Sequence, residues 1–438
     1  MKATYSVVVL AALSLSGGAR ADAPAAPTVT VVRAARLLDV ASGELKADQA
    51  VLVRGERIAE VGPAAEIKAH APAGATVIDL GDVTLLPGLI DVHTHVAMGD
   101  LSHHHDKDRL RLDSIDEAVR AHVYARRTLE AGVTSVRDLG TADYVDVALA
   151  AAIDEGVVVG PRMQPASLGV GATGGHFDPT SGLSAHLAIV NEPSGIADGV
   201  DKIRELIRTE IKHGAQVIKM AATAGVLSEE EAVGSPQYSQ EEMNVIVEEA
   251  HRWGRKVAAH AHGAEGIRMA TRAGVASIEH GTFIDEEGLK LMKERGTYLV
   301  PQIFSPEVLH QFEQAGMPEV VLKKARAAFA AQLDGFRRAL KSGVKIAFGT
   351  DAGVYPHGEN PRQLARMVGA GMAPLEALKS ATLNAADLLG WSDRVGAIKP
   401  GLYADLIAVP GNPLTDMSVV ERVRFVMKGG TVVKRLDP

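Results

Sequence analysis

The amino-acid sequence predicts an α/β protein: a (β/α)8 barrel joined to a small β-sandwich that both chain ends form together. Two observations predict this fold. From Thr84 to about Leu389, short apolar runs alternate with longer helical segments, the pattern of βαβ units on a parallel sheet. On both sides of this region the pattern changes to short strands divided by glycine and proline turns. We therefore assign residues 22–83 and 396–438 to the sandwich, and residues 84–395 to the barrel.

The first 21 residues have the features of a bacterial secretory signal peptide. Lys2 precedes an apolar run, Tyr5 to Ser16, that is too short to span a bilayer. Residues 19–21, Ala-Arg-Ala, supply the small-x-small cleavage pattern. We expect cleavage after Ala21 and a periplasmic or secreted protein with no membrane contact after cleavage. An uncleaved tether is the alternative.

The expected elements follow from the apolar runs and the turns between them. The sandwich strands are Val29–Val32, Gln49–Val53, Arg57–Val61, Thr76–Leu80, Asp405–Val409, Val423–Met427 and Thr431–Lys434. The barrel strands are Thr84–Val92, Val133–Arg137, Arg162–Pro165, Gln216–Met220, Lys256–His260, Ala276–His280, Tyr298–Pro301 and Lys345–Thr350. Helices between them include Ser114–Ala131, Val200–His213, Ser239–Gly254, Glu265–Ala273 and Pro318–Ser342. A doubly wound open sheet is the alternative, but no Gly-rich dinucleotide loop supports it.

Composition excludes several classes of function. The 438 residues carry a formal net charge of −8, which argues against a nucleic-acid-binding surface. The chain has no cysteine, so disulfides, thiolate metal sites and a cysteine nucleophile are all excluded.

Side chains that can bind metal ions recur at the carboxyl ends of the expected barrel strands, where such barrels build their sites. In an extended chain His93 and His95 point to the same face, so both can reach one ion. Imidazole and carboxylate are ligands for zinc and similar ions. The residues at these strand ends are His93, His95, Lys219, His260, His262, His280 and Asp351.

Lys219 lies in an apolar run and needs a separate explanation. An ammonium group cannot bind a metal ion, but apolar surroundings favour the neutral amine. A neutral amine can take up carbon dioxide and become a carbamate that bridges two ions. The alternative is an ordinary ion pair with a neighbouring carboxylate.

The order of these residues, with the segments PGLIDVHTH, GVTSVRDLG, GATGGH, IKMAATAG, AAHAHG, SIEHG and FGTDA, resembles the amidohydrolase superfamily. More narrowly, the chain resembles the dinuclear prolidase-like and carboxypeptidase-like dipeptidases and the bacterial ochratoxin-hydrolysing amidohydrolases. The resemblance covers essentially the whole mature chain.

The resemblance implies two divalent ions, most commonly Zn²⁺. It assigns His93, His95 and Asp351 to the more buried ion, and His260 and His280 to the other. N-carboxylated Lys219 and a hydroxide bridge the two ions. Asp351 accepts the hydroxide proton and passes it to the leaving amine.

Substrate contacts are expected from three residues: His176 and Tyr238 match substrate positions in the resembling dipeptidases, and His262 has the same geometry relative to His260 as His95 has to His93. For all three the alternative is loop structure. Arg137 and Asp138 are expected to form a buried structural pair.

Two polar loops are expected near the mouth of the site. Residues 103–105, three consecutive histidines, are interpreted as a solvated loop, because consecutive side chains diverge. Residues 234–236, Gly-Ser-Pro, are interpreted as a flexible entrance loop.

The sequence therefore predicts a dinuclear metal-dependent hydrolase of amide bonds whose leaving group is an amino acid with a free α-carboxylate. Dipeptides, N-acyl amino acids and ochratoxin A fit this description. A cyclic-amide hydrolase of imidazolonepropionase type is the alternative among enzymes, and a periplasmic metal-binding protein without catalysis is the alternative outside them. The resembling enzymes also imply a homo-oligomer.

Overall fold

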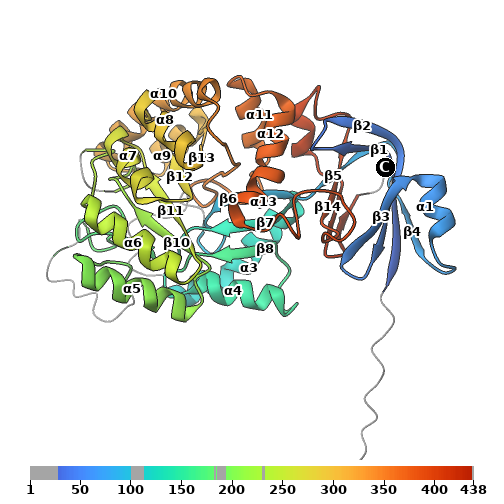
Figure 1. The fold of residues 1–438 in the computed structure, drawn as a ribbon, viewed down its shortest axis with the longest axis horizontal. Coiled ribbons are helices and arrows are strands. Elements are labelled where there is room, and N and C mark those ends of the chain that lie inside the picture. The colour runs from blue at the N-terminus through green and yellow to red at the C-terminus, as the bar shows by residue number, and fades with distance from the viewer. Residues whose placement is uncertain (1–27, 100–112, 182–183, 185–193, 229–231, 437–438) are drawn as a thin grey trace, which may run out of the picture.

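The computed structural model describes residues 28–99, 113–181, 184, 194–228 and 232–436. Figure 1 shows a barrel surrounded by helices at one end of the long axis and a β domain at the other. The expected signal peptide and residues 103–105 lie outside the described residues. Among those described, no helix combines the length and apolarity that a bilayer span requires.

The barrel strands pair in parallel in two hydrogen-bonded groups, β6-β7-β8 and β9-β10-β11-β12-β13. Their bounds are β6 (Leu89–Thr94), β7 (Val133–Asp138), β8 (Arg162–Pro165), β9 (Gly169–Val170), β10 (Val217–Ala221), β11 (Lys256–Ala261), β12 (Ser277–His280) and β13 (Tyr298–Val300).

Isolated backbone hydrogen bonds and bridges, instead of continuous ladders, join the two groups around the barrel. The eighth expected strand is an extended segment that makes isolated bridges instead of a continuous ladder. Leu299 N donates to the Lys345 carbonyl at 2.8 Å on one side, and Val92 N donates to the Phe348 carbonyl at 2.9 Å on the other. Between β8 and β10, Gln216 N donates to the Pro165 carbonyl at 2.8 Å. The third strand breaks into β8 and β9 around Ser167, whose φ of 68° no strand residue adopts.

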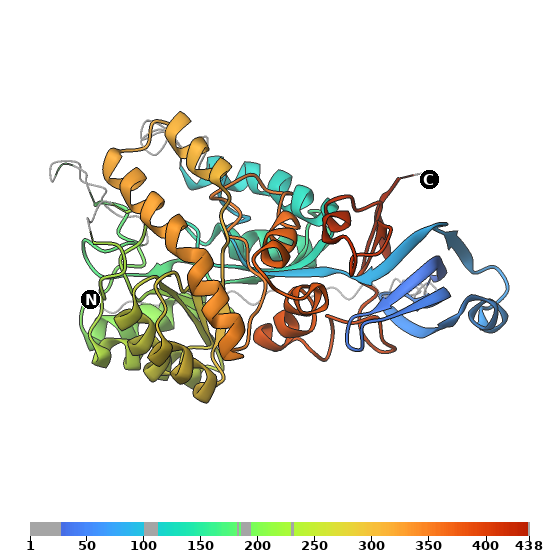
Figure 2. The same cartoon turned by 90° about the horizontal axis from the view of Figure 1, so that it is seen from above.

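Helices alternate with these strands and cover the outside of the barrel (Figures 1 and 2). They are α3 (Ser114–Glu130), α4 (Val145–Asp154), α5 (Val200–His213), α6 (Gln240–Arg252), α7 (Ala264–Ala273), α8 (Glu286–Arg295), α9 (Pro306–Gln314), α10 (Glu319–Ser342), α11 (Arg362–Gly369), α12 (Pro374–Ser380) and α13 (Leu383–Leu389). The Ser239–Glu242 capping box is present at the start of α6. In Figure 2 the long helix α10, in orange, runs diagonally over the outside of the barrel.

The prediction that Thr84–Val92 forms one barrel strand was wrong. Its first half is β5 (Val83–Pro87), which pairs with β1 and β14 in the β domain. Gly88 lies between β5 and β6, and only glycine fits there, because a Cβ atom would lie 2.0 Å from Thr134 Oγ1. The chain thus passes from the β domain into the barrel at this glycine.

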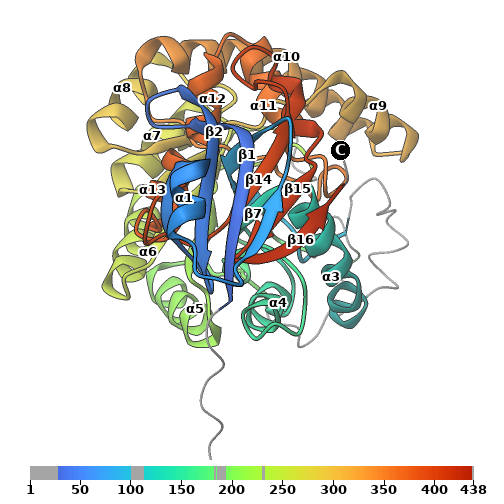
Figure 3. The ribbon, with the colours of Figure 1, turned by 90° about the vertical axis from the view of Figure 1, so that its right-hand side faces the viewer.

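The two chain ends form one composite β domain, as predicted. One continuous sheet runs β16-β15-β14-β5-β1-β2-β3, with β4 paired to β1. Figure 3 shows the N-terminal strands in blue beside the C-terminal strands in red. Side chains of both ends, among them Val32, Leu406 and Phe425, share a hydrophobic core. The elements are β1 (Val29–Asp39), β2 (Glu44–Arg54), β3 (Arg57–Pro63), α1 (Ala64–His70), β4 (Thr76–Asp79), β14 (Leu406–Pro410), the 3-10 helix η2 (Met417–Glu421), β15 (Phe425–Lys428) and β16 (Thr431–Arg435).

Candidate functional site

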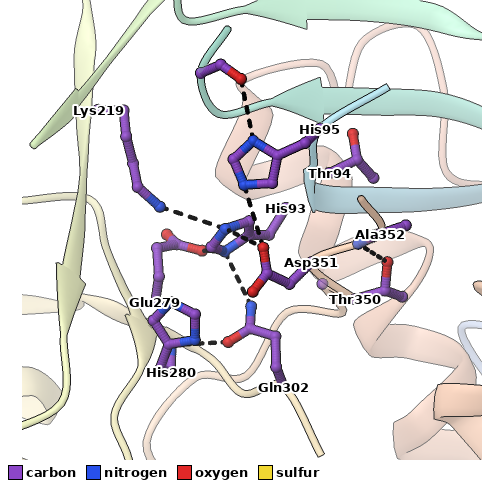
Figure 4. Close-up of polar contacts among 12 residues, drawn as sticks. His93, Thr94, His95, Lys219, Glu279, His280, Gln302, Thr350, Asp351 and Ala352 are labelled. Carbon is purple, nitrogen blue, oxygen red and sulfur yellow. Dashed lines mark hydrogen bonds and ion pairs between the residues drawn. The ribbon is translucent and has the colours of Figure 1, made fainter. Parts of the chain in front are cut away.

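The first ligand cluster consists of His93 and His95 at the end of β6 and Asp351 at the end of the eighth strand segment. Asp351 Oδ1 lies 3.1 Å from His95 Nε2 and 3.3 Å from His93 Nε2 (Figure 4). Burial alone would raise the pKa of Asp351, but the two imidazoles outweigh it and hold that pKa well below its usual range. A carboxylate and two imidazole nitrogens therefore converge on one point.

The second ligand cluster consists of His260 at the end of β11, His262 just after it, and His280 at the end of β12. One nitrogen of each ring lies within 4.8 Å of the others. The rings of His262 and His280 stack with centroids 4.6 Å apart. Among the described residues His260 Nε2 is buried and has no hydrogen-bond partner. An unpaired buried nitrogen costs free energy unless something binds it, so this donor set fits a divalent cation.

Lys219 extends from β10 toward the first cluster, with Nζ 3.4 Å from His93 Nε2 (Figure 4). Its side chain is almost fully buried. Burial lowers the pKa of Lys219 to about 8, although Glu279 and Asp351 act in the opposite direction. Within the described chain its amine makes no ion pair with a carboxylate, so the simple ion-pair alternative finds no support.

The backbone is strained at one residue of each cluster. His280 has φ 69° and Asp351 has φ 62°, the left-handed region that side chains rarely adopt. Gln302 accepts a hydrogen bond from His280 N at 2.9 Å, and Asp351 N donates to the His93 carbonyl at 2.7 Å. These bonds hold both residues in an unfavourable conformation, which is typical of functional sites.

Both clusters and Lys219 line one cavity of about 930 Å³. His176 also lines it, with its ring centroid 4.1 Å from that of His260. Burial lowers the pKa of His176 and that of His262 to about 3, so both rings are neutral near pH 7. Gly225 makes room for His176, because a Cβ atom there would lie 2.2 Å from the ring.

Comparison with known proteins agrees with the resemblance found in the sequence. Residues 84–433 match the model of the amidohydrolase family, and residues 50–73 match an imidazolonepropionase-like composite domain of bacteria. The chain belongs to the amidohydrolase family.

Several relatives of this amidohydrolase match along nearly their full length. An ochratoxinase of Aspergillus niger is 35% identical over 93% of this chain and 87% of its own. A solved Xaa-Pro dipeptidase with bound methionine is 38% identical, with TM-score 0.87, over 92% of this chain and 99% of that one. A prolidase complexed with N-methylphosphonate-L-proline is 34% identical, with TM-score 0.83, over 93% and 100%. The resemblance found in the sequence is therefore confirmed, and the chain is a hydrolase of amide bonds.

The amidohydrolase site contains an acidic residue to which the sequence analysis gave no role. Glu279 is fully buried beside His280, and its Oε2 lies 2.8 Å from His93 Nδ1. Burial would raise the pKa of Glu279, but the charge of Arg137 and the bond with His93 bring it down to about 2. The carboxylate therefore accepts from His93 Nδ1–H and leaves the Nε2 lone pair free for a metal ion. The position of Glu279, a charged residue in a buried strand, was the sequence signal that could have indicated this role.

The expected pairing of Arg137 with Asp138 was wrong. Adjacent residues of a strand point to opposite faces. Arg137 Nη2 pairs instead with Glu279 Oε1 at 2.9 Å. Asp138 accepts a hydrogen bond from Val96 N. Arg137 thus supports His93 indirectly through Glu279.

The structure does not bring Tyr238 to the cavity. Its side chain is 3% exposed, and its hydroxyl donates to the Ala197 carbonyl at 2.9 Å. Among the described residues this arrangement matches the loop alternative, and the expected contact with the substrate carboxylate stays a prediction. The nearby residues 234–236 are held to the loop after β10, since Gly234 N donates to the Ala224 carbonyl at 3.0 Å.

Proposed function

We propose that this chain is a dinuclear metal-dependent amidohydrolase that cleaves the amide bond of dipeptides and N-acyl amino acids with a free α-carboxylate. The observation that carries the proposal is the presence of two ligand clusters, with a buried lysine beside the first, on the wall of one cavity. A cyclic-amide hydrolase of imidazolonepropionase type is the second candidate, which the short match of residues 50–73 favours.

The proposed ligands follow from the chemistry of the two clusters. His93, His95 and Asp351 would hold one ion, and His260 and His280 the other, with N-carboxylated Lys219 between them. The nitrogen geometry also brings His262 within reach of the second ion. When bound, two divalent ions such as Zn²⁺ lower the pKa of a water molecule and polarise the scissile carbonyl.

Lys219 is suited to carboxylation because its surroundings favour the neutral amine. The lone pair of that amine attacks carbon dioxide, and one proton leaves as the carbamate forms. Burial, which lowers the pKa of Lys219 to about 8, increases the neutral fraction near pH 7.

Asp351 is the proposed proton carrier. Its carboxylate lies beside the imidazoles of His93 and His95 on the cavity wall, where it can accept a proton from the attacking water and return it to the leaving amine. The neutral rings of His176 and His262 line the same cavity and can hydrogen-bond a substrate oxygen. This proton carrier also favours an enzyme over a protein that only stores metal.

The substrate class rests on the relatives. Methionine and N-methylphosphonate-L-proline, which are bound to two of them, both carry an amino-acid carboxylate. Ochratoxin A, to which the name of one relative refers, is an N-acyl amino acid as well, and cleavage of its amide bond would give ochratoxin alpha and phenylalanine. We extend the proposal to this substrate, to a homo-oligomeric state and to export into the periplasm or medium by residues 1–21.

A substrate screen tests the proposal. Zinc-loaded protein is incubated with Xaa-Pro, Xaa-Lys and N-acyl-phenylalanine substrates, with C-terminally amidated forms of each, and with imidazolonepropionate. We expect hydrolysis of free-carboxylate substrates, slower hydrolysis of amidated forms and none of the cyclic amide. Turnover of imidazolonepropionate alone would overturn the proposal in favour of the second candidate.

A further inference from the structure

Phenylalanine is concentrated at the cavity. The chain is poor in aromatic residues, at 4%, and has only eight phenylalanines. Four of them line this one cavity: Phe177, Phe304, Phe312 and Phe329. Such a concentration is not needed to fill the barrel core, which consists mainly of aliphatic side chains.

Three of these rings form a continuous surface, which we call the aromatic wall: Phe304 after β13, Phe312 on α9 and Phe329 on α10. The centroid of Phe329 lies 5.3 Å from that of Phe304 and 6.4 Å from that of Phe312. Leu227 and Val354 line the cavity and belong to the same hydrophobic cluster. Phe304 and Phe329 are only partly buried, so their rings remain available to a ligand.

The aromatic wall is fixed relative to the metal ligands. Gln332 on α10 accepts from Phe304 N at 3.0 Å and donates to the Phe304 carbonyl at 2.8 Å. Two residues before Phe304, Gln302 hydrogen-bonds His280 N. Two residues span at most about 7 Å of chain, so the wall begins next to the ligand clusters. It is a preformed surface and needs no rearrangement to bind.

Among the described residues, no charged side chain lines the part of the cavity that the aromatic wall forms. Among the described residues only Lys219, Asp178 and Asp351 bring an Asp, Glu, Lys or Arg side chain to the cavity lining. Lys219 and Asp351 belong to the metal site. The Asp178 carboxylate accepts from Gly174 N and Thr180 N in its own loop. A charged side chain placed against the rings would lose its hydration without compensation.

We propose that the aromatic wall binds a large apolar side chain, aromatic by preference, on the amino acid that the enzyme releases. The inference rests on the proposed function and narrows its substrate class. In the proposed function the released amine receives its proton from Asp351. Val354, which shares the hydrophobic cluster of the aromatic wall and lines the cavity, lies three residues after Asp351. The wall therefore disfavours substrates that release lysine, arginine or glycine.

Four substrates and three variants test this inference. The substrates are N-acetyl-L-phenylalanine, N-acetylglycine, Nα-acetyl-L-lysine and N-benzoylglycine, which carries its aromatic ring on the acyl side. The variants are Phe329→Ala, Phe304→Ala and the control Leu333→Ala, which alters a partly buried side chain of α10 that does not line the cavity. The zinc-loaded protein is used throughout.

We expect the wild type to prefer N-acetyl-L-phenylalanine over the glycine and lysine derivatives by at least about 10-fold in kcat/KM. Phe329→Ala and Phe304→Ala should lose about 10-fold on the phenylalanine substrate and little on N-acetylglycine. Leu333→Ala should keep the wild-type preference. Equal losses on both substrates, or no preference in the wild type, would overturn the inference. A preference for N-benzoylglycine over N-acetylglycine that the variants abolish would overturn the assignment to the released amino acid.

Failure of the proposed function is recognised separately, because the wild type would then cleave neither these four substrates nor the dipeptides of the screen. In that case the rise in melting temperature produced by L-phenylalanine is compared with that produced by glycine. A rise with phenylalanine that Phe329→Ala removes would support the wall as a binding surface. Equal rises in wild type and variant would overturn it.

Discussion

The first ligand cluster differs from the second in what surrounds its imidazoles. In the first, His93 Nδ1 is bonded to Glu279 and His95 Nδ1 to the Gly140 carbonyl, and Asp351 adds a negative charge. In the second, His260, His262 and His280 have no carboxylate among them. The Asp351 carboxylate raises the pKa of His95 against the effect of burial, whereas burial and neighbouring imidazoles lower the pKa of His260 and that of His280.

This difference indicates that the two clusters have separate tasks. The first is oriented by anions before any ion arrives, so it can place a proton-accepting carboxylate accurately. The second is an uncharged group of rings in which His262 Nδ1 is bonded to Thr282 Oγ1 at 2.8 Å, while His260 Nε2 has no partner among the described residues and is open to a cation. Five experiments test whether the two clusters differ in this way.

Asp351→Asn should have the largest effect. It removes the only carboxylate of the first cluster and makes both clusters uncharged. We expect kcat to fall by about 10³-fold, since general acid and base catalysis is lost, with an unchanged circular dichroism spectrum. Steady-state kinetics on a substrate found by the screen measures this, and wild-type kcat in the variant would refute the proton-carrier role.

Lys219→Ala tests whether the two clusters act together. Without the carbamate, we expect most of the bound metal and the activity to be lost, and short-chain carboxylic acids to restore part of both. Metal analysis by atomic emission provides the readout. Wild-type metal content in the variant would remove the bridging role.

Glu279→Gln should weaken only the first cluster. Loss of the anion that orients His93 is expected to reduce metal affinity by about 10- to 100-fold. Competition with a chromophoric chelator measures it. The control is Glu249→Gln, which removes a carboxylate paired to Arg208 away from the cavity; a similar loss in this control would show a general effect.

Acid should destabilise the metal-free protein through the second cluster and the neighbouring His176. His176, His260, His262 and His280 all have lowered pKa values when folded, so below about pH 6.5 the unfolded chain binds more protons on these residues. The free energy of unfolding should therefore fall as the pH decreases from 6.5 toward 4. Urea unfolding in chelator at several pH values tests this, and His176→Gln should reduce the slope.

Tyr238→Phe should have the smallest effect, since it lies outside both clusters. Removing the hydroxyl breaks the bond to the Ala197 carbonyl and should cost about 1 kcal/mol of unfolding free energy. Kinetic constants on free-carboxylate substrates should stay at the wild-type values. A raised KM on these substrates, but not on amidated ones, would show that Tyr238 contacts the substrate carboxylate.

Local sequence patterns predicted much of the fold and of the ligand set. The capping box at Ser239 and the alternation of strands and helices depend on neighbouring residues, so a sequence can reveal them. The position of His93 and Asp351 at strand ends also sufficed to predict that their side chains lie close together, because parallel strands of a barrel bring their carboxyl ends to one side. The division of Thr84–Val92 at Gly88 was missed, because it depends on pairing with distant segments: β5 pairs with β1 and β14, and β6 with β7.

Periodicity and strand direction in the sequence were thus enough to predict the barrel, the composite β domain and the metal-binding side chains at the strand ends, and the family resemblance divided these side chains between two ions. The groups that support them became visible only in the folded chain. Glu279 meets Arg137 across 142 residues of chain, and Tyr238 turns toward Ala197 instead of the cavity. The aromatic wall is assembled from a loop and two helices. Contacts of this kind are set by packing between distant segments, which no local pattern in the sequence specifies.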